Sequence, residues 1–487
     1  MEKYDVIYIG SGNAAWQGGR FLRNAGLKVL IIEEGLYGGT CANRGCNSKA
    51  LLDAPYELLA AIDKFEGVGK KGNFSVDWNA LMKFKQKRIA NMSKFLDGKF
   101  NEYDLDVAHG KGIIVDERTV QVEKTKYRTD KIVIATGLKP IIPKIPGKQY
   151  LHDSSDFLDI DELPKHTIII GGGFVGMEFA SIIAEAGLQA DVLVHSDMIL
   201  RNFYQPYVQK AIKILEEKNI RFHFNQNVKE IIKKENESLS IDPEAKINLV
   251  ENGMNADKKL RDPEAKIDNK AYDNAFTVVT DSGLELTGDY VISAIGREPN
   301  ISDIGLENVN IEYTKAGIPV NGFLQTKVPN IYAVGDVADT GQAKLVTVAI
   351  HQSKYLGKEL VKHEKEITYP VVPAVVYTIP RIATVGVPVY KTLESKDKYD
   401  VHRLRYGRSY SLECKNDTTA EVTVVVDKEL NIVGAEIYAA DAENIANIFT
   451  FIINKKITLE ELDYMIYAFP SSSSVCLYKL HNIHYEL

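Results

Sequence analysis

The sequence predicts an α/β fold with two Rossmann-like dinucleotide-binding domains and a C-terminal α+β domain. Three observations support this fold class. An apolar segment, a glycine-rich turn and a helical segment follow one another over residues 4–25, and the same succession recurs over 167–186. From about residue 369 the pattern changes to apolar strand-like segments such as 421–426, with helical segments near 441–454 and 471–480.

The first unit begins with a strand at residues 4–9, followed by a Gly-x-Gly-x-x-Ala turn that contains Gly10, Gly12 and Ala15. Glycine lets the backbone approach a pyrophosphate, and the following helix presents free N–H groups and its positive dipole end. Glu33 ends the next strand about 20 residues downstream, where a carboxylate accepts hydrogen bonds from a ribose. This unit is therefore predicted to bind a dinucleotide.

The second unit predicts a second dinucleotide site, with Gly171, Gly173 and Gly176 in its turn. The strand after its helix ends in His195, with Arg201 close behind, and no carboxylate stands at the ribose position. Cationic side chains there favour the 2′-phosphate of NADP, whereas a third glycine is the form typical of NAD sites. We give the charges more weight and predict NADPH, with NADH as the alternative.

Residues 233–275 are polar and highly charged, and they contain the segment Asp-Pro-Glu-Ala-Lys-Ile twice, at 242–247 and 262–267. Proline and the charges disfavour a long regular element. We interpret this stretch as a surface hairpin extension, which is also a candidate for docking a protein partner.

Composition and charge exclude several function classes. The chain is 45% hydrophobic, which is too apolar for a disordered protein. Lys and Arg total 59 against 66 for Asp and Glu, and the net charge of −7 disfavours nucleic acid and anionic membranes as partners. No apolar run reaches the roughly 20 residues that span a bilayer, and the N-terminus lacks the pattern of a secretory signal. We expect a cytoplasmic protein.

Two of the four cysteines, Cys41 and Cys46, lie in the segment Gly-Gly-Thr-Cys-Ala-Asn-Arg-Gly-Cys-Asn-Ser-Lys, which is predicted to open a helix. On the first helical turn the two sulfurs can reach each other as a disulfide, and a helix N-terminus lowers the pKa of a thiol. Metal binding needs two more ligands, and no partner stands at ordinary zinc spacing. A pair of buried core cysteines is the remaining alternative, which the flanking glycines disfavour.

Together with these segments, further motifs give the chain a family resemblance. They are 134–137 (Ile-Ala-Thr-Gly), 294–300 (Ala-Ile-Gly-Arg-Glu-Pro-Asn), 335–336 (Gly-Asp) and 377–383 (Tyr-Thr-Ile-Pro-Arg-Ile-Ala). The sequence resembles the class I pyridine nucleotide-disulfide oxidoreductases, the family of glutathione reductase, dihydrolipoamide dehydrogenase and mercuric reductase. The resemblance covers almost the whole chain.

The resemblance implies an FAD domain in two parts, 1–150 and 300–368, an NAD(P) domain over 151–299, and a dimerisation domain over 369–487. It implies electron flow from NAD(P)H through FAD to a Cys41–Cys46 disulfide, with Cys46 beside the flavin and Cys41 facing the substrate. Lys49 would pair with Glu178 near the flavin. The implied FAD contacts are Gly10, Gly12, Ala15, Glu33, Gly39, Thr40, Lys49, Gly112, Thr136, Gly137, Asp336 and Thr347. The implied nicotinamide-nucleotide contacts are Gly171, Gly173, Gly176, Glu178, His195, Arg201, Gly296 and Arg297. No metal site is implied.

The chain departs from the family at its C-terminal His-Glu pair, where Phe469 and Ser474 stand instead. The family's histidine comes from the partner subunit and protonates the leaving thiolate, a step that a phenyl ring cannot perform. General acid catalysis is worth roughly 10²–10⁴-fold. We therefore expect slow reduction of ordinary disulfides. A phenylalanine at this position also resembles 2-ketopropyl-coenzyme M oxidoreductase/carboxylase, where an apolar site shields a carbanion from protons.

Other features bear on the same chemistry. The turn after Cys46 is one residue shorter than the family pattern, which makes the position of Lys49 uncertain from the sequence. His481 and His484 are candidate replacement acids, and Cys476 is either a redox relay or, as its apolar neighbours favour, a buried thiol. The serines at 471–474 are interpreted as turn residues, because no base stands at motif spacing.

We predict a homodimeric FAD-dependent NAD(P)H oxidoreductase with a redox-active disulfide. Its acceptor is either an unusual small-molecule disulfide or another group, such as a metal ion, a quinone or a persulfide, that needs no proton donor from the enzyme. A carboxylase-type reductive C–S cleavage and an electron-transfer subunit for a protein partner are the alternatives.

Overall fold

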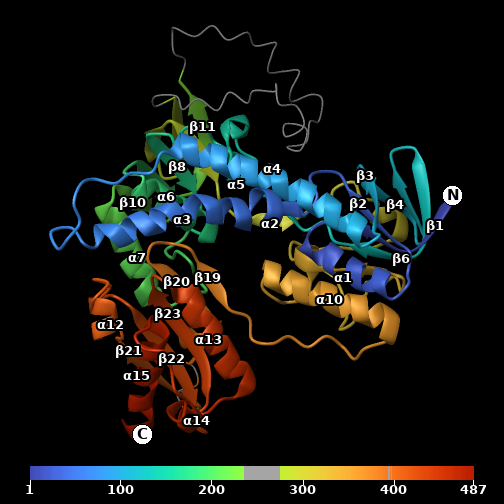
Figure 1. The fold of residues 1–487 in the computed structure, drawn as a ribbon. Helices are drawn as coiled ribbons and strands as arrows, with labels where there is room; N and C mark the ends of the chain where they lie inside the picture. The colour runs from blue at the N-terminus through green and yellow to red at the C-terminus, as the bar shows by residue number, and fades with distance from the viewer. Residues whose placement is uncertain (235–274, 393–394, 396, 487) are drawn as a thin grey trace.

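The computed structural model describes residues 1–234, 275–392, 395 and 397–486 (Figure 1). Most of the predicted 233–275 extension, including both copies of its repeated segment, lies outside the described residues. In the part that is described, the chain forms two sheets of Rossmann type and an antiparallel C-terminal sheet. The α/β fold class predicted from the sequence is confirmed.

The N-terminal sheet has seven strands in the order β3-β2-β1-β6-β5-β4, with β17 also paired to β6. Its strands are β1 (Glu2–Ile9), β2 (Val29–Glu33), β3 (Asp106–His109), β4 (Gly112–Asp116), β5 (Thr119–Val122), β6 (Thr125–Ile134) and β17 (Ile331–Ala333). Apart from β4 and β5, the pairs are parallel. Since β17 follows the second Rossmann unit in the chain, the chain returns to its first sheet after building the second.

Helices α1 (Asn13–Asn24) and α10 (Val346–Lys362) pack against each other beside this sheet (Figure 1). They approach closely because Gly18 lies at the contact, where its N–H donates a 2.8 Å hydrogen bond to Ser353 Oγ. This contact joins residues more than 300 positions apart and fixes both helices next to the first glycine-rich turn.

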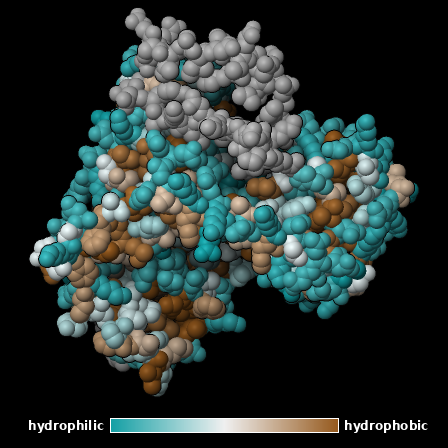
Figure 2. All heavy atoms as spheres, turned by 45° about the horizontal axis from the view of Figure 1, so that its top comes forward, coloured by the Kyte–Doolittle hydropathy of each residue, from teal (hydrophilic) through white to brown (hydrophobic). Residues whose placement is uncertain are grey.

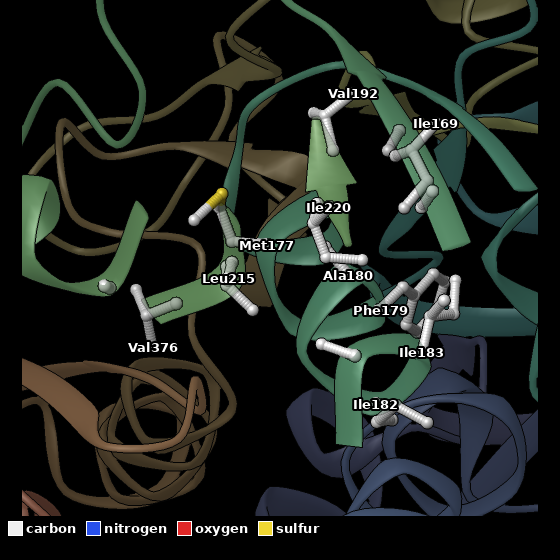
Figure 3. Packing of buried hydrophobic residues seen from close by; sticks show 14 of the residues in the cluster. Ile169, Met177, Phe179, Ala180, Ile182, Ile183, Val192, Leu215, Ile220 and Val376 are labelled. Atoms are coloured by element: carbon white, nitrogen blue, oxygen red, sulfur yellow. The ribbon is translucent and has the colours of Figure 1, made fainter. Parts of the chain in front are cut away.

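The second sheet is parallel, with the order β10-β9-β8-β14. Its elements are β8 (His166–Ile170), α6 (Phe174–Glu185), β9 (Gln189–Leu193), α7 (Gln205–Glu217), β10 (Ile220–His223) and β14 (Tyr290–Ser293). Figure 3 shows Met177, Ala180 and Ile183 of α6 in the apolar cluster that also contains Ile169 and Val192 of the strands. Helix α6 is buried over nearly its whole length, which explains why its sequence is apolar all round.

A small antiparallel sheet covers one end of this domain, formed by β11 (Val228–Lys233), β12 (Phe276–Thr280) and β13 (Glu285–Gly288). Lys233 lies opposite Phe276, and Lys234 N donates to the Ala275 carbonyl at 2.8 Å. The described residues 233–234 and 275–276 are therefore paired with each other.

Three helices connect the N-terminal sheet to the second domain. They are α2 (Gly39–Arg44), α3 (Cys46–Asp63) and α4 (Trp78–Glu102). Helix α3 packs on α6, and Trp78 Nε1 at the start of α4 donates to the Ile160 carbonyl at 2.9 Å. Two short strand pairs and four short helices complete this part: β7 (Leu138–Pro140) with β15 (Arg297–Pro299), β16 (Ile318–Pro319) with β18 (Ala338–Asp339), η1 (Lys148–Tyr150), α5 (Ser154–Phe157), η2 (Glu307–Val309) and η3 (Gly335–Val337).

The C-terminal domain is a five-stranded antiparallel sheet in the order β19-β20-β23-β22-β21. Its elements are β19 (Ala374–Val376), β20 (Arg381–Gly386), α11 (Val389–Thr392), β21 (Tyr399–Leu404), α12 (Tyr410–Glu413), β22 (Glu421–Asp427), β23 (Ile432–Ala439), α13 (Ala442–Lys455), α14 (Leu459–Asp463) and α15 (Ser472–Glu486). Figure 2 shows one face of the whole molecule, on which hydrophilic side chains are interspersed with hydrophobic side chains at the left, at the right and at the lower end of the view.

Three sequence expectations need correction. The strand predicted over 331–336 ends at Ala333, and Gly335 and Asp336 lie in the short helix η3 instead. The helix predicted near 471–480 is present as α15, and residues 472–474, interpreted as turn residues, form its first turn, where the Ser471 hydroxyl accepts a hydrogen bond from Ser474 N. The helices after the two glycine-rich turns, expected from about Trp16 and from Met177, begin earlier, at Asn13 and Phe174. Within the described residues, no helix combines the length and the hydrophobicity needed to cross a bilayer.

Candidate active site

Cys41 and Cys46 belong to two different helices. Cys41 lies in the six-residue helix α2, and Cys46 is the first residue of α3, because Gly45 between them has φ −146° and ψ −120° and interrupts the helix. The expectation that both cysteines share the first turn of one helix is therefore wrong. Both are free thiols in the structure, with Cys41 partly buried and Cys46 exposed.

The two thiols interact with each other directly. A hydrogen bond from Cys41 is the largest cause that lowers the pKa of Cys46 to about 7, and the positive charge of Lys49 lowers it further against the effect of burial. The same hydrogen bond is the largest cause that raises the pKa of Cys41 above its usual range. In the reduced pair these shifts favour the negative charge on Cys46 and the proton on Cys41.

The cysteine segment packs directly against the first glycine-rich turn. Gly39 has φ +64°, and a Cβ atom placed on it would lie 3.0 Å from the Gly12 Cα. Only a residue without a side chain fits this contact without displacing the backbone. Two close glycines thus hold helix α2, with Thr40 and Cys41, against the turn that is predicted to bind a dinucleotide.

Lys49 and Glu178 form an ion pair between α3 and α6, with Nζ 2.9 Å from Oε1. Both side chains are largely buried, at 17% and 7% exposure. Glu178 Oε1 also accepts a 3.0 Å hydrogen bond from Tyr377 N, and Lys49 Nζ lies 3.6 Å from the centre of the Tyr377 ring. The pair expected from the sequence is present despite the shortened turn after Cys46.

The first glycine-rich turn has the groups that a dinucleotide needs. Helix α1 begins after Gly12 without any side-chain cap, which leaves its first N–H groups for a ligand. Glu33, at the carboxyl end of β2, accepts hydrogen bonds from Ser11 N at 2.9 Å and Ser11 Oγ at 2.6 Å. The Thr136 hydroxyl is buried and has no hydrogen-bond partner among the described residues. These observations fit a bound FAD.

The other predicted FAD contacts lie around this turn. Gly112 begins β4, and Gly137 follows β6. Asp336 lies in η3, where burial raises the pKa of its carboxyl and the charges of Lys344 and Arg297 oppose that effect. Thr347 is exposed in the first turn of α10, a helix whose N-terminus also lacks a side-chain cap. The remaining predicted contacts are Gly10 at the end of β1 and the fully buried Ala15 in α1.

The second glycine-rich turn has the close packing typical of a dinucleotide site. Gly171 lies at the end of β8, and a Cβ atom on Gly176 would lie 2.1 Å from the Gly171 carbonyl oxygen. Gly173 is the N-cap of α6, and a Cβ atom there would meet nothing within 4 Å. Space for a ligand therefore lies at Gly173, whereas Gly176 is needed for helix–strand contact.

The cationic residues expected near this turn are at the surface. His195 follows β9 and is exposed, and Arg201 is exposed with Nη2 4.0 Å from Asp197 Oδ1. Gly296 lies between β14 and β15, and Arg297 Nη2 donates to the Leu138 carbonyl at 2.7 Å. Asp197 is a nearby carboxylate that the sequence prediction of a 2′-phosphate site did not consider.

Phe469 lies between α14 and α15 and is 66% exposed, whereas Ser474 is buried and donates to the Ser471 carbonyl at 3.0 Å. Cys476 is 1% exposed in the C-terminal core, and burial raises the pKa of its thiol. The interpretation of Cys476 as a buried thiol is thus confirmed. His481 Nδ1 contacts Asp463 Oδ1, and the side chain of His484 lies outside the described residues.

Sequence reasoning missed the charged groups that support the ion pair. Arg381 contacts Glu57 and lies 2.5 Å from Glu443 and 3.6 Å from Asp53, which is one helical turn beyond Lys49. Burial raises the pKa of Asp53 to about 6, against the opposing charges of Arg381 and Lys49. Lys49, Asp53 and Glu57 are four residues apart, so they lie on one face of a helix, and this spacing could have indicated the cluster from the sequence. Within the described part of the chain, no group of three or more His, Cys, Asp or Glu side chains is placed to hold a metal ion.

Comparison with known proteins agrees with this geometry. Residues 4–353 match the model of the pyridine nucleotide-disulphide oxidoreductase family, and residues 372–477 match its dimerisation domain. The chain is 27% identical to glutathione reductase from Nostoc sp. over 96% of this chain and 98% of that one. It is also 27% identical to dihydrolipoyl dehydrogenase from Chlamydia pneumoniae, over 97% and 95%.

Among solved structures, the Cu(II) complex of the HOCl-induced flavoprotein disulfide reductase RclA from Escherichia coli has a similar fold. Its TM-score is 0.83 at 23% identity, covering 99% of this chain and 100% of that one. The family matches span both Rossmann units and the C-terminal sheet described above. The chain therefore belongs to the pyridine nucleotide-disulphide oxidoreductase family and is a flavin-dependent oxidoreductase that acts on sulfur groups.

Proposed function

We propose that this enzyme passes electron pairs from NADPH, by way of FAD, to the Cys41–Cys46 pair and then to an acceptor that needs no proton from an enzyme imidazole. One observation carries the proposal: the cysteine segment packs on the first dinucleotide turn through Gly39 and Gly12, with the Lys49–Glu178 pair beside it. FAD bound at that turn would supply two-electron transfer between a nicotinamide and the cysteine pair.

The two sulfurs have different roles in the proposed reaction. Two electrons and one proton convert the Cys41–Cys46 disulfide into a Cys46 thiolate and a Cys41 thiol, the charge state that their pKa values favour. Lys49 stabilises the thiolate, and Glu178 holds Lys49 in place. For attack on an acceptor, Cys41 gives its proton to Cys46 and becomes the nucleophile.

Residues at both turns would hold the coenzymes. The N–H groups at the start of α1, Glu33 and the unpartnered Thr136 hydroxyl would bind FAD. The start of α6 would bind the pyrophosphate of NADPH, with His195 and Arg201 at the 2′-phosphate. Because Asp197 offsets part of the charge of Arg201, we expect a moderate preference for NADPH over NADH.

The nature of the acceptor follows from Phe469. In the homodimer that we propose, Phe469 of one subunit faces the Cys41 of the other, where the family carries its acid. Exposed apolar side chains on the C-terminal domain support this dimer, among them Phe451, Tyr464 and Ile466. A leaving thiolate that is not protonated can attack the mixed disulfide again and reverse the reaction. Acceptors whose reduction releases no thiolate are therefore favoured.

The same apolar side chain favours a second candidate reaction. Reductive cleavage of a carbon–sulfur bond forms a carbanion, and a phenyl ring in place of an acid would protect it from protons until it reacts with carbon dioxide. Product formation that depends on bicarbonate would distinguish this reaction from simple reduction.

A kinetic comparison on the FAD-loaded dimer tests the first proposal. We expect faster flavin reduction by NADPH than by equal NADH in stopped flow, and a smaller difference in the His195→Gln/Arg201→Gln variant. In turnover we expect a quinone to be reduced faster than glutathione disulfide or lipoamide. Disulfide turnover at rates ordinary for the family would contradict the proposed acceptor class, and loss of quinone turnover in Cys46→Ser would place the cysteines on the electron path.

A further inference from the structure

A cavity of about 560 Å³ lies far along the chain from the cysteines, between α7 of the second Rossmann domain and the strands β21 and β22 of the C-terminal domain. The Tyr207 and Thr423 hydroxyls, 2.8 Å apart, join these elements in the domain interior. Figure 1 shows α7 directly beside the C-terminal domain. The volume of the cavity is within the range of small-molecule sites.

The cavity is strongly basic although the chain as a whole is acidic. Five cations line it: Lys210, Lys213, Arg403, Arg405 and Arg408. Two carboxylates, Glu217 and Glu421, also line it, so its formal net charge is +3. The chain has a net charge of −7, which makes such a concentration of cations informative.

One carboxylate is shared by three of the cations. Glu421 lies 2.6 Å from Arg403 Nη2, 2.8 Å from Lys210 Nζ and 3.6 Å from Arg405 Nε. Neither Lys213 nor Arg408 forms an ion pair with any residue that the structure describes. The ion pairs with Glu421 therefore orient three of the cations, while the net charge of the cavity stays positive.

A buried hydroxyl provides an independent sign of a ligand. Tyr438 lines the cavity and is only 1% exposed, yet its hydroxyl has no hydrogen-bond partner within the described chain. Buried hydroxyls are normally paired, and burial here raises the pKa of Tyr438, so it stays a neutral donor. A ligand atom that accepts a hydrogen bond would complete this site.

We propose that the cavity binds a small molecule with two or more linked phosphate groups. The guanidinium fork of arginine matches phosphate oxygens in pairs, and the excess of three positive charges suits the charge of a di- or triphosphate. The Tyr438 hydroxyl would donate to one of the oxygens. Because the cavity is lined by residues of α7 and of β21, a bound ligand would link the second Rossmann domain to the C-terminal domain.

Titration calorimetry on the FAD-loaded dimer without NADPH tests this site, with inorganic tripolyphosphate as the probe. We expect saturable binding to the unchanged protein and at least tenfold weaker binding to Lys213→Gln/Arg408→Gln. The control Lys83→Gln/Lys87→Gln removes the same charge from the exposed face of α4 and should bind as the unchanged protein does. Equal weakening in both variants would show a general charge effect and overturn the proposal.

A second variant separates ligand binding from structure. Tyr438→Phe removes a hydroxyl that has no partner to lose, so thermal unfolding without ligand should be unchanged, whereas tripolyphosphate should bind several-fold more weakly. Binding that survives in the cavity variants but is lost in His195→Gln/Arg201→Gln would place the anion in the coenzyme site and overturn the proposal. Equally tight binding of citrate would overturn the assignment of phosphate.

Discussion

Lys49 Nζ lies 2.9 Å from Glu178 Oε1, joining the helix that begins at Cys46 to the helix of the second glycine-rich turn. This pair connects α3, which begins at Cys46, to α6, which carries predicted coenzyme contacts. The Tyr377 N–H adds a third element, from just after β19. Residues of α3, of α6 and of the segment after β19 thus meet at this one ion pair.

Lys49→Met should destabilise the protein by about 3 kcal/mol, because Glu178 would keep a buried charge with only the Tyr377 N–H as its described partner. Denaturant unfolding followed by circular dichroism measures this. Lys327→Met breaks an exposed pair with Glu312 and should change little. Equal losses in the two variants would mean that the Lys49 pair has no special structural role.

Alkylation of reduced Cys46 should have its midpoint near pH 7, since only the thiolate reacts and the pKa of Cys46 is lowered to about 7. Cys41→Ala removes the largest cause of that lowering and should move the midpoint to higher pH. Iodoacetamide rates, assigned by mass spectrometry, measure both. Cys414→Ser should leave the curve unchanged, and a midpoint near 9 in the unchanged protein would refute the assignment of the thiolate to Cys46.

Phe469→His should raise turnover of glutathione disulfide at least about tenfold if proton supply limits the reaction. The measurement is steady-state NADPH oxidation with the disulfide, and the pH profile should gain a dependence near the pKa of histidine. Phe95→His, at an exposed position of α4, is the matched control and should have no effect. No gain at position 469 would remove this residue from the explanation of acceptor choice.

Glu436 predicts a pH dependence of stability that is independent of catalysis. Burial raises its pKa from 4.5 to about 7 in the folded state. Between these values the folded state holds a proton that the unfolded state has lost, so stability falls as pH rises from about 4.5 to 7. Between pH 4.5 and 7 this fall in the free energy of unfolding is on the order of 3 kcal/mol, and Glu436→Gln should remove it. Urea unfolding at several pH values measures it; Glu429→Gln should keep the original slope.

Much of the fold was predictable because its signals are local. The glycine turns at Gly10 and Gly171 follow apolar strands and precede helices, and both produced the expected Rossmann units. The segment around Cys41 was harder. A Cβ atom on Gly45 would lie 2.9 Å from the Thr40 carbonyl oxygen, so the break between the two helices favours glycine, but nothing in the adjacent residues indicates that a helix ends there.

Contacts between residues far apart in the chain are the part of the candidate site that the sequence pattern could not predict. The Lys49–Glu178 pair joins residues 129 positions apart, and only the family resemblance predicted it. The Arg381 cluster and the basic cavity at Arg408 each unite distant segments, and a single sequence carries no pattern for either. Asp197, by contrast, is close to Arg201 in the sequence, and its negative charge could have been considered when the 2′-phosphate site was predicted.

Anaerobic titration of the FAD-loaded protein with NADPH tests the central claim most directly. The first two electrons should produce a long-wavelength absorption band and make two thiols alkylatable, which mass spectrometry should assign to Cys41 and Cys46. The Cys46→Ser variant should lack that band. A preparation that stays colourless after added FAD, or a flavin that is reduced while both cysteines remain unreactive, would contradict electron transfer through this pair.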